Sequence, residues 1–92
     1  MWKGTGELES TRIISLNVVV SNSGAAEELN KLLHEYRQYI IGRMGIPYRE
    51  KGVSIITVVL DASDDVGNAL SGRVGMIDGI ECKTVRAKLG IA

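Results

Sequence analysis

Aromatic side chains are scarce in this sequence, and so are cysteine and histidine, the residues that form disulfides and bind metals. Among 92 residues there is no phenylalanine, aromatic residues make up 4%, and proline, cysteine and histidine occur once each, as Pro47, Cys82 and His34. A lone cysteine excludes an internal disulfide, and one histidine with one cysteine is too few for the about four ligands of a structural zinc site. Because 45% of the residues are still hydrophobic, the core must be aliphatic.

An excess of charge is also absent, since eleven basic residues balance eleven acidic residues. A neutral chain does not suit general nucleic-acid binding, whose affinity comes mainly from neutralising phosphates, so we predict no autonomous nucleic-acid binding. No run approaches the roughly 18 apolar residues of a membrane-spanning helix, and the N-terminal residues contain no apolar signal region. We therefore predict a cytoplasmic protein without membrane attachment.

The length predicts a single domain. Residues 1–11 have little apolar content and are predicted to form a flexible leader, and residues 12–92 the domain itself. Hydrophobic patterns and turn residues predict strands at 12–20, 40–46, 53–60 and 80–85, a helix at 25–39, and a second helix that is capped by Asp61, Ser63 or Asp64 and ends near Gly75. The order βαββαβ predicts an α+β, ferredoxin-like sandwich in which two helices cover one face of a four-stranded antiparallel sheet.

The composition of each predicted strand indicates its position in the sheet. Pro47 ends the second strand and places it at an edge, because proline cannot donate to a ladder. The third strand is the most apolar and suits the centre, whereas the charged last strand suits the other edge. In the second helix, Gly67 and Gly72 each cost about 1 kcal/mol relative to alanine unless close packing offsets the cost. The residues expected to face inward from the helices are Leu29, Leu32, Leu33, Tyr36, Ile40, Val66, Ala69, Leu70 and Val74.

Alternation divides the first and third strands into two faces. The more apolar set of each strand is expected to face the helices: Ile14, Leu16, Val18, Val20, Ser54, Ile56, Val58 and Leu60. The opposite face still carries Ile13, Val19, Val53, Ile55 and Val59. An apolar patch of this extent is rare on a monomer, so it favours a homo-oligomer, a dimer or a tetramer, over a one-sided sheet with stray apolar residues.

No catalytic nucleophile set is visible, and we predict neither an enzyme nor a cofactor. Asp61, Asp64 and Asp65 precede a helix, where capping explains them better than paired catalytic carboxylates. His34 falls outside the apolar stripe of its helix and is expected at the surface, and Cys82 is expected as a small core or edge residue. We predict no metal site within one chain.

Two segments are candidates for ligand or interface contacts. The backbone N–H groups of Asn22, Ser23 and Gly24 could hold an anion at a helix N-terminus, although plain capping explains them as well. The second segment comprises residues 42–49 and does not resemble a phosphate loop. Its arginines could bind a carboxylate or phosphate in bidentate fashion, or they could be only solvated edge residues. Its candidate residues are Gly42, Arg43, Gly45, Tyr48 and Arg49.

The stretches at 30–36 and 40–50, which include Gly42-Arg43-Met44-Gly45-Ile46-Pro47-Tyr48, resemble the regulator family of the iron-only hydrogenase system. Residues 52–56, Asp61 and 69–75 are similar to it in the same order, and the resemblance spans about 12–86. It implies an ACT-like fold akin to the ligand-binding domain of the nickel regulator NikR. It also implies a regulatory domain that senses a small-molecule effector as a homo-oligomer; the alternative is a protein-interaction or assembly factor without a ligand.

The chain also departs from NikR. NikR binds nickel through three histidines and a cysteine, which one copy of this chain cannot supply. NikR carries a separate ribbon-helix-helix DNA-binding domain, whereas only eleven residues precede the first predicted strand here. Both differences agree with the prediction of no metal and no autonomous DNA binding.

Overall fold

A computed structural model describes residues 11–87. The elements in chain order are β1 (Thr11–Val20), α2 (Ser23–Glu35), the 3-10 helix η1 (Arg37–Tyr39), β2 (Ile40–Tyr48), the 3-10 helix η2 (Arg49–Lys51), β3 (Val53–Ser63), α3 (Asp64–Gly75) and β4 (Ile80–Arg86). Residues 1–10 of the predicted leader and residues 88–92 of the predicted domain lie outside the described residues. Thr11, which was assigned to the leader, is the first residue of β1.

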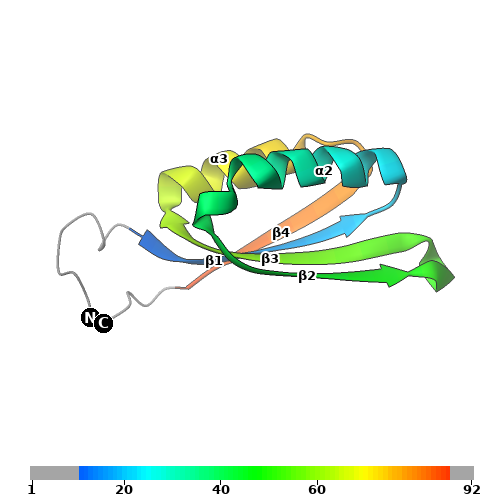
Figure 1. Cartoon of the computed structure of the whole chain (residues 1–92), viewed down its shortest axis with the longest axis horizontal. Helices are drawn as coiled ribbons and strands as arrows, with labels where there is room; N and C mark the ends of the chain where they lie inside the picture. The colour runs from blue at the N-terminus through cyan, green and yellow to red at the C-terminus, as the bar shows by residue number, and fades with distance from the viewer. Residues whose placement is uncertain (1–10, 88–92) are drawn as a thin grey trace.

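The four strands form one sheet in the order β2-β3-β1-β4, and every neighbouring pair is antiparallel. Both α-helices lie over the same face of this sheet (Figure 1). The α+β, ferredoxin-like and ACT-like fold predicted from the sequence is confirmed. The central position of β3 and the edge positions of β2 and β4 are also as predicted.

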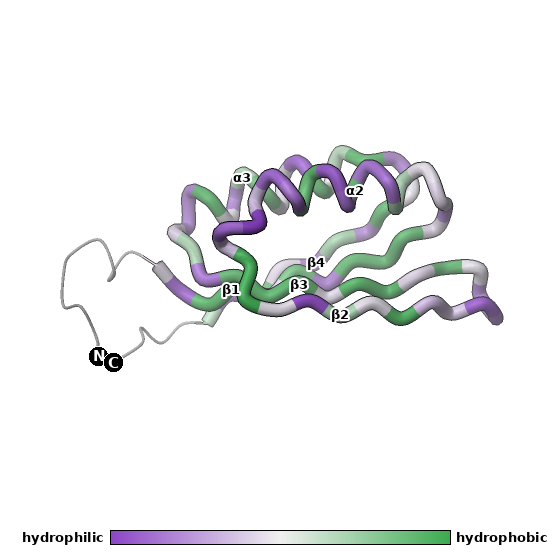
Figure 2. Tube along the Cα trace, in the orientation of Figure 1, coloured by the Kyte–Doolittle hydropathy of each residue, from purple (hydrophilic) through white to green (hydrophobic). Residues whose placement is uncertain are grey.

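The core lies between the helices and the sheet. Figure 2 shows hydrophobic segments along the central strands and at intervals along the helices. The buried residues of the core are Ile14, Leu16, Val18, Val20, Ala25, Leu29, Leu32, Leu33, Ile56, Val58, Leu60, Ala62, Leu70, Val74 and Ile77. The predicted assignment of the two strand faces is therefore confirmed, because every residue of the predicted inward set is buried except Ser54, which is half-buried.

The C-terminal ends of three elements differ from the predictions by two residues or more. The first helix ends at Glu35 rather than at 39, and the chain tightens into η1 because Ile40 is already held in β2. The second strand continues through Pro47, which pairs with Ser54; an edge strand tolerates proline, since the missing N–H faces no neighbour. The third strand runs three residues further, to Ser63, which caps α3 by accepting a hydrogen bond from the N–H of Val66 at 3.2 Å.

The inward stripe of α3 also differs from the prediction. Ala69 is exposed, and Gly67 is buried at the position one helical turn before Leu70. A Cβ atom added to Gly67 would lie 2.5 Å from Cδ1 of Ile14 in β1, whereas nothing lies within 4 Å of the same point at Gly72. Gly67 therefore lets α3 approach the sheet closely, which confirms the expected compensation for one of the two helical glycines.

Among the described residues, no helix combines the length and the apolar character needed to cross a membrane.

Candidate functional site

The sheet face away from the helices is apolar, and no element of residues 11–87 covers it. Strand register places Met44, Ile46 and Tyr48 of β2 opposite Thr57, Ile55 and Val53 of β3, so the three side chains of β2 lie on this face. Their exposed fractions are 57%, 44% and 39%, and those of Val19 and Ile55 are 37% and 36%. We call this surface the open face.

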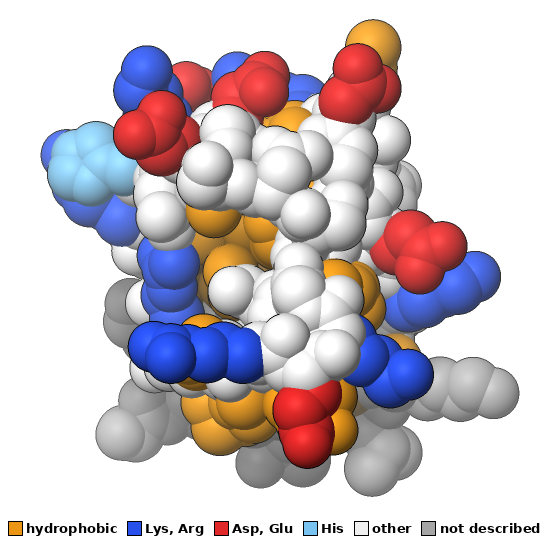
Figure 3. All heavy atoms as spheres, turned by 90° about the vertical axis from the view of Figure 1, so that its right-hand side faces the viewer, with side chains coloured by type: hydrophobic (Ala, Val, Ile, Leu, Met, Phe, Trp, Pro, Cys, Tyr) orange, Lys and Arg blue, Asp and Glu red, His pale blue; other side chains and the backbone are white. Residues whose placement is uncertain are grey.

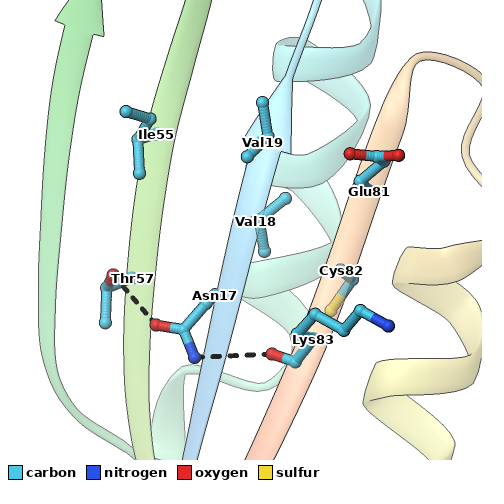
Figure 4. Close-up of a pocket in the computed structure, with 8 residues that line it drawn as sticks. All are labelled: Asn17, Val18, Val19, Ile55, Thr57, Glu81, Cys82 and Lys83. Atoms are coloured by element: carbon cyan, nitrogen blue, oxygen red, sulfur yellow. Dashed lines mark hydrogen bonds between the residues drawn. The ribbon is translucent and has the colours of Figure 1, made fainter.

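The middle of the open face holds a polar belt. Asn17 donates a hydrogen bond from Nδ2 to the carbonyl oxygen of Lys83 at 3.5 Å and accepts one from Oγ1 of Thr57 at 3.4 Å (Figure 4). The side chains of Glu81 and Lys83 border a hollow of about 430 Å³ beside Val19. The belt therefore links β3, β1 and β4, and it places one acid and one base next to the apolar residues.

A β-bulge determines which side chains of β2 face the helices. Ile40 is paired with Leu60, but Gly42 is paired with Val59, so Ile41 is an extra residue in β2. In a regular strand Ile40 and Gly42 would share a face, because side chains two residues apart point to the same side. The bulge instead turns Gly42 to the open face and Arg43, which is opposite the buried Val58, to the helix side.

Arg43 lies at one end of a groove between α2 and β2. Its Nη2 donates a hydrogen bond to Oδ1 of Asn30 on α2. A hollow of about 280 Å³ lies here between polar and apolar side chains. The residues that border it are Asn30, Leu33, His34, Arg37, Ile40 and Arg43. Arg37 donates from Nη1 to the carbonyl oxygen of His34 at 2.9 Å. Two guanidinium groups and the imidazole therefore surround one small hollow, which we call the arginine hollow.

The other end of the groove holds the remaining candidate residues. Asn22, Ser23, Tyr48 and Arg49 all border a hollow of about 350 Å³. Asn22 accepts a hydrogen bond from the N–H of Ala25 at 2.7 Å and is the N-cap of α2. A hydrogen bond with Glu50 raises the pKa of the Tyr48 phenol above its ordinary value. The capping interpretation therefore accounts for Asn22.

The candidate glycines are divided between these surfaces. Gly24 lies in the first turn of α2, and an added Cβ would be 3.4 Å from Oδ1 of Asn22. Gly45 is opposite Ile56 on the helix side of β2, where an added Cβ would meet only the Ile56 side chain at 3.9 Å. Gly42 lies on the open face. The predicted segment 42–49 is thus not one site, because alternate residues project to opposite faces of the sheet.

The titratable residues considered for chemistry have structural surroundings. Asp64 lies in the first turn of α3, 3.3 Å from Nε of Arg12 and 3.7 Å from Nε of Arg86. Cys82 is half-buried, and this burial raises the pKa of its thiol although a hydrogen bond with Thr84 lowers it. His34 is exposed, as predicted. Within residues 11–87 no three His, Cys, Asp or Glu side chains gather as a metal site.

The sequence analysis did not identify Asn30, which accepts a hydrogen bond from Arg43, or Arg37, which borders the same hollow. The signal was available in part, because residues 30, 33 and 37 follow a helical spacing and form one face. Their meeting with β2 depends on the packing of the helix over the edge strand. The polar pair Asn17 and Thr57 was likewise visible only as alternation, and its contact depends on strand register.

Comparison with solved structures finds strong similarity to the uncharacterized protein TM1266 from Thermotoga maritima. The two chains are 39% identical with a TM-score of 0.82, and the match covers 85% of this chain and 99% of that one. The C-terminal domain of the MgtC protein from Mycobacterium tuberculosis shares the fold, with a TM-score of 0.68 at 11% identity over 91% of this chain and 96% of that one. A homoserine dehydrogenase from Thiobacillus denitrificans does so too, with a TM-score of 0.60 at 16% identity over 86% of this chain and 18% of that one.

A search of curated proteins finds no match to this chain. A family model described as "TM1266-like: Iron-only hydrogenase system regulator, putative" matches residues 12–84. The match includes both helices, the groove between α2 and β2, and most of β4. By this match and by the identity with TM1266, the chain belongs to the TM1266-like family of iron-only hydrogenase system regulators.

Proposed function

We propose that this protein regulates the iron-only hydrogenase system as a homodimer whose subunits meet through the open face. The observation that carries the proposal is the row of exposed apolar side chains on that face, from Val19 on β1 across Ile55 on β3 to Met44 and Ile46 on β2. Monomers rarely leave a contiguous apolar surface of this kind in water. Membership of the regulator family supports the regulatory part.

The dimensions of the open face suit a second copy of the chain. Four strands spaced about 4.8 Å apart, with about nine residues each rising about 3.3 Å, give a face of roughly 570 Å². Two such faces in contact bury on the order of 1,000 Å², which reaches the lower limit of specific interfaces. A monomer mass in the oligomer measurement would favour a different protein as the partner of this face.

Charge on the open face supports the same partner. Glu81 and Lys83 have opposite signs and are adjacent on the same face of β4, because they pair with Val19 and Asn17 of β1. In a twofold-symmetric contact each interaction occurs twice with the roles exchanged. A face that carries one acid beside one base is therefore complementary to itself, and two copies can pair Glu81 of one subunit with Lys83 of the other.

The experiment is a mass measurement by light scattering after size exclusion at micromolar concentration. The wild-type chain is expected as a dimer. Ile55→Lys would bury an unpaired charge in the interface and is expected to raise the dimer dissociation constant about 100-fold or more. Met76→Lys is the matched control, since Met76 is 85% exposed at the end of α3 and outside the open face. A monomeric wild-type chain would refute the interface.

The regulatory part is tested in the host organism. Replacement of the gene by the Ile55→Lys variant is expected to change hydrogenase activity as deletion of the gene does, whereas Met76→Lys leaves it at the wild-type level. If deletion itself has no effect on hydrogenase activity or on the amount of the enzyme, the regulatory function is wrong, whatever the oligomeric state.

A further inference from the structure

We propose that the arginine hollow binds the phosphate group of a small effector through Arg37 and Arg43. This proposal names the chemical class of the regulator's effector. Only the regulatory consequence of phosphate binding rests on the proposed function. The hollow is formed by the C-terminal half of α2, by η1 and by the beginning of β2.

The two arginines are oriented by neutral acceptors. Arg43 donates to the amide oxygen of Asn30, and Arg37 donates to the backbone carbonyl of His34. A guanidinium group has five N–H donors in a fixed plane, so each of these contacts orients the group and leaves further donors for a ligand. Neither contact neutralises the positive charge. In residues 11–87, no carboxylate lies within ion-pair distance of Arg37 or Arg43.

The lining of the hollow is suited to an anion with more than one charge. Besides the two arginines it includes the imidazole of His34 as a further N–H donor, and no Asp or Glu borders it. Glu27, two helical turns before His34, is exposed and is not among the lining residues. Figure 3 shows Lys and Arg side chains on the same flank of the molecule as the histidine. Two guanidinium groups that converge from different elements match a phosphate better than a single carboxylate.

The β-bulge at Ile41 is a second observation that supports a site here. With regular pairing and no bulge, Gly42 rather than Arg43 would face the helix side, and the hollow would lose one of its two guanidinium groups. Leu33, which is buried, and Ile40, which is half-buried, supply an apolar surface beside the charges. The site therefore fits either inorganic phosphate or a phosphate ester whose small apolar group lies against Leu33 and Ile40.

The experiment is a calorimetric titration of the full chain with inorganic phosphate and with phenyl phosphate at constant ionic strength. Both probes are expected to bind, and Arg43→Gln and Arg37→Gln are each expected to weaken binding about tenfold or more, since charged hydrogen bonds are lost. Arg43→Lys retains the charge without the planar fork and is expected to fall between Arg43→Gln and wild type. Tighter binding of phenyl phosphate identifies an ester as the ligand class, and equal binding identifies free phosphate.

Arg49→Gln is the matched control. Arg49 also has no carboxylate partner within the described part of the chain, but it borders the hollow at the other end of the groove. It is expected to leave binding unchanged. An equal loss in Arg49→Gln would show nonspecific attraction to the positive charge, and the absence of binding by the wild-type chain would refute the site. The same titration with the Ile55→Lys variant separates this result from the dimer, because the hollow lies within one chain and a monomer is expected to bind phosphate.

Discussion

The arginines of the molecule fall into two groups, one around α3 and one beside α2 and β2. Arg12 on β1, Arg86 on β4 and Arg73 on α3 each lie 3.0 to 3.7 Å from a carboxylate oxygen. Arg37, Arg43 and Arg49, on η1, β2 and η2, have no such partner in residues 11–87.

The pairing on the first side joins separate elements. Asp64 at the start of α3 lies between Arg12 and Arg86 and so connects β1, β4 and α3. Arg73 connects the two helices through Glu35 at 3.0 Å and also lies 5.7 Å from the ring centroid of Tyr36. Ion pairs therefore join the elements around α3, whereas the arginine charge beside α2 and β2 is left available.

The largest expected difference concerns close packing. Gly67→Ala places a Cβ 2.5 Å from Ile14 and is expected to destabilise the protein by about 1 kcal/mol net, because the strain of overpacking exceeds the gain in helix propensity. Gly72→Ala, with nothing within 4 Å, is expected to stabilise it by about 1 kcal/mol. Gly45→Ala on β2 meets only an ordinary contact and should be tolerated. Urea denaturation measures all three, and equal values for Gly67→Ala and Gly72→Ala would contradict the close approach of α3.

Asn22→Ala tests whether the start of α2 is a cap or a binding segment. Loss of the hydrogen bond to the N–H of Ala25 is expected to cost about 1 kcal/mol of the free energy of unfolding. Ser63→Ala removes the corresponding cap of α3 and is the matched control with a similar cost. Phosphate binding should not change in either variant. If Asn22→Ala is fully stable but loses phosphate affinity, the segment binds ligand and the capping interpretation is wrong.

Asp64→Asn should separate the two groups of arginines directly. Both of its ion pairs are about half exposed, so their loss is expected to cost roughly 0.5 to 1 kcal/mol in total, and less at high salt. Arg43→Gln removes a charge that no carboxylate balances and is expected to change the free energy of unfolding by only a few tenths of a kcal/mol. Thermal denaturation at low and high salt measures both. A salt-dependent loss in Arg43→Gln comparable with that in Asp64→Asn would remove the contrast.

The smallest effect concerns Cys82. Because its burial raises the pKa of the thiol in the folded chain, the unfolded chain ionises at a lower pH than the folded chain. The stability that this shift contributes is therefore present below the ordinary thiol pKa and falls as the pH rises above it. Alkylation by iodoacetamide near pH 8 should be slower in the folded chain than in urea. Equal rates would show that the thiol is as accessible and as acidic as in the unfolded chain.

The architecture and the two faces of the sheet could be predicted from the sequence alone. Alternation on β1 and β3 identifies the buried and open residues, because the side-chain period of a strand is two and only one face is covered. Pro47 and the charges of the last strand identify the edges, and the cap candidates, Asn22 for the first helix and Asp61, Ser63 or Asp64 for the second, indicate where the helices begin. These features are local, so they can be read without knowing which segments meet.

The directions of the candidate side chains and the residues that they contact depend on the tertiary structure. The bulge at Ile41 leaves no clear mark in the residue pattern, yet it sends Gly42 and Arg43 to opposite faces. Arg43 lies thirteen residues after Asn30 in the chain, and their contact depends on α2 lying beside β2. Gly67 rather than Ala69 belongs to the inward stripe of α3, and this depends on how closely α3 approaches Ile14. Register, bulges and packing distances arise from contacts between distant segments, and these contacts form only when the chain has folded.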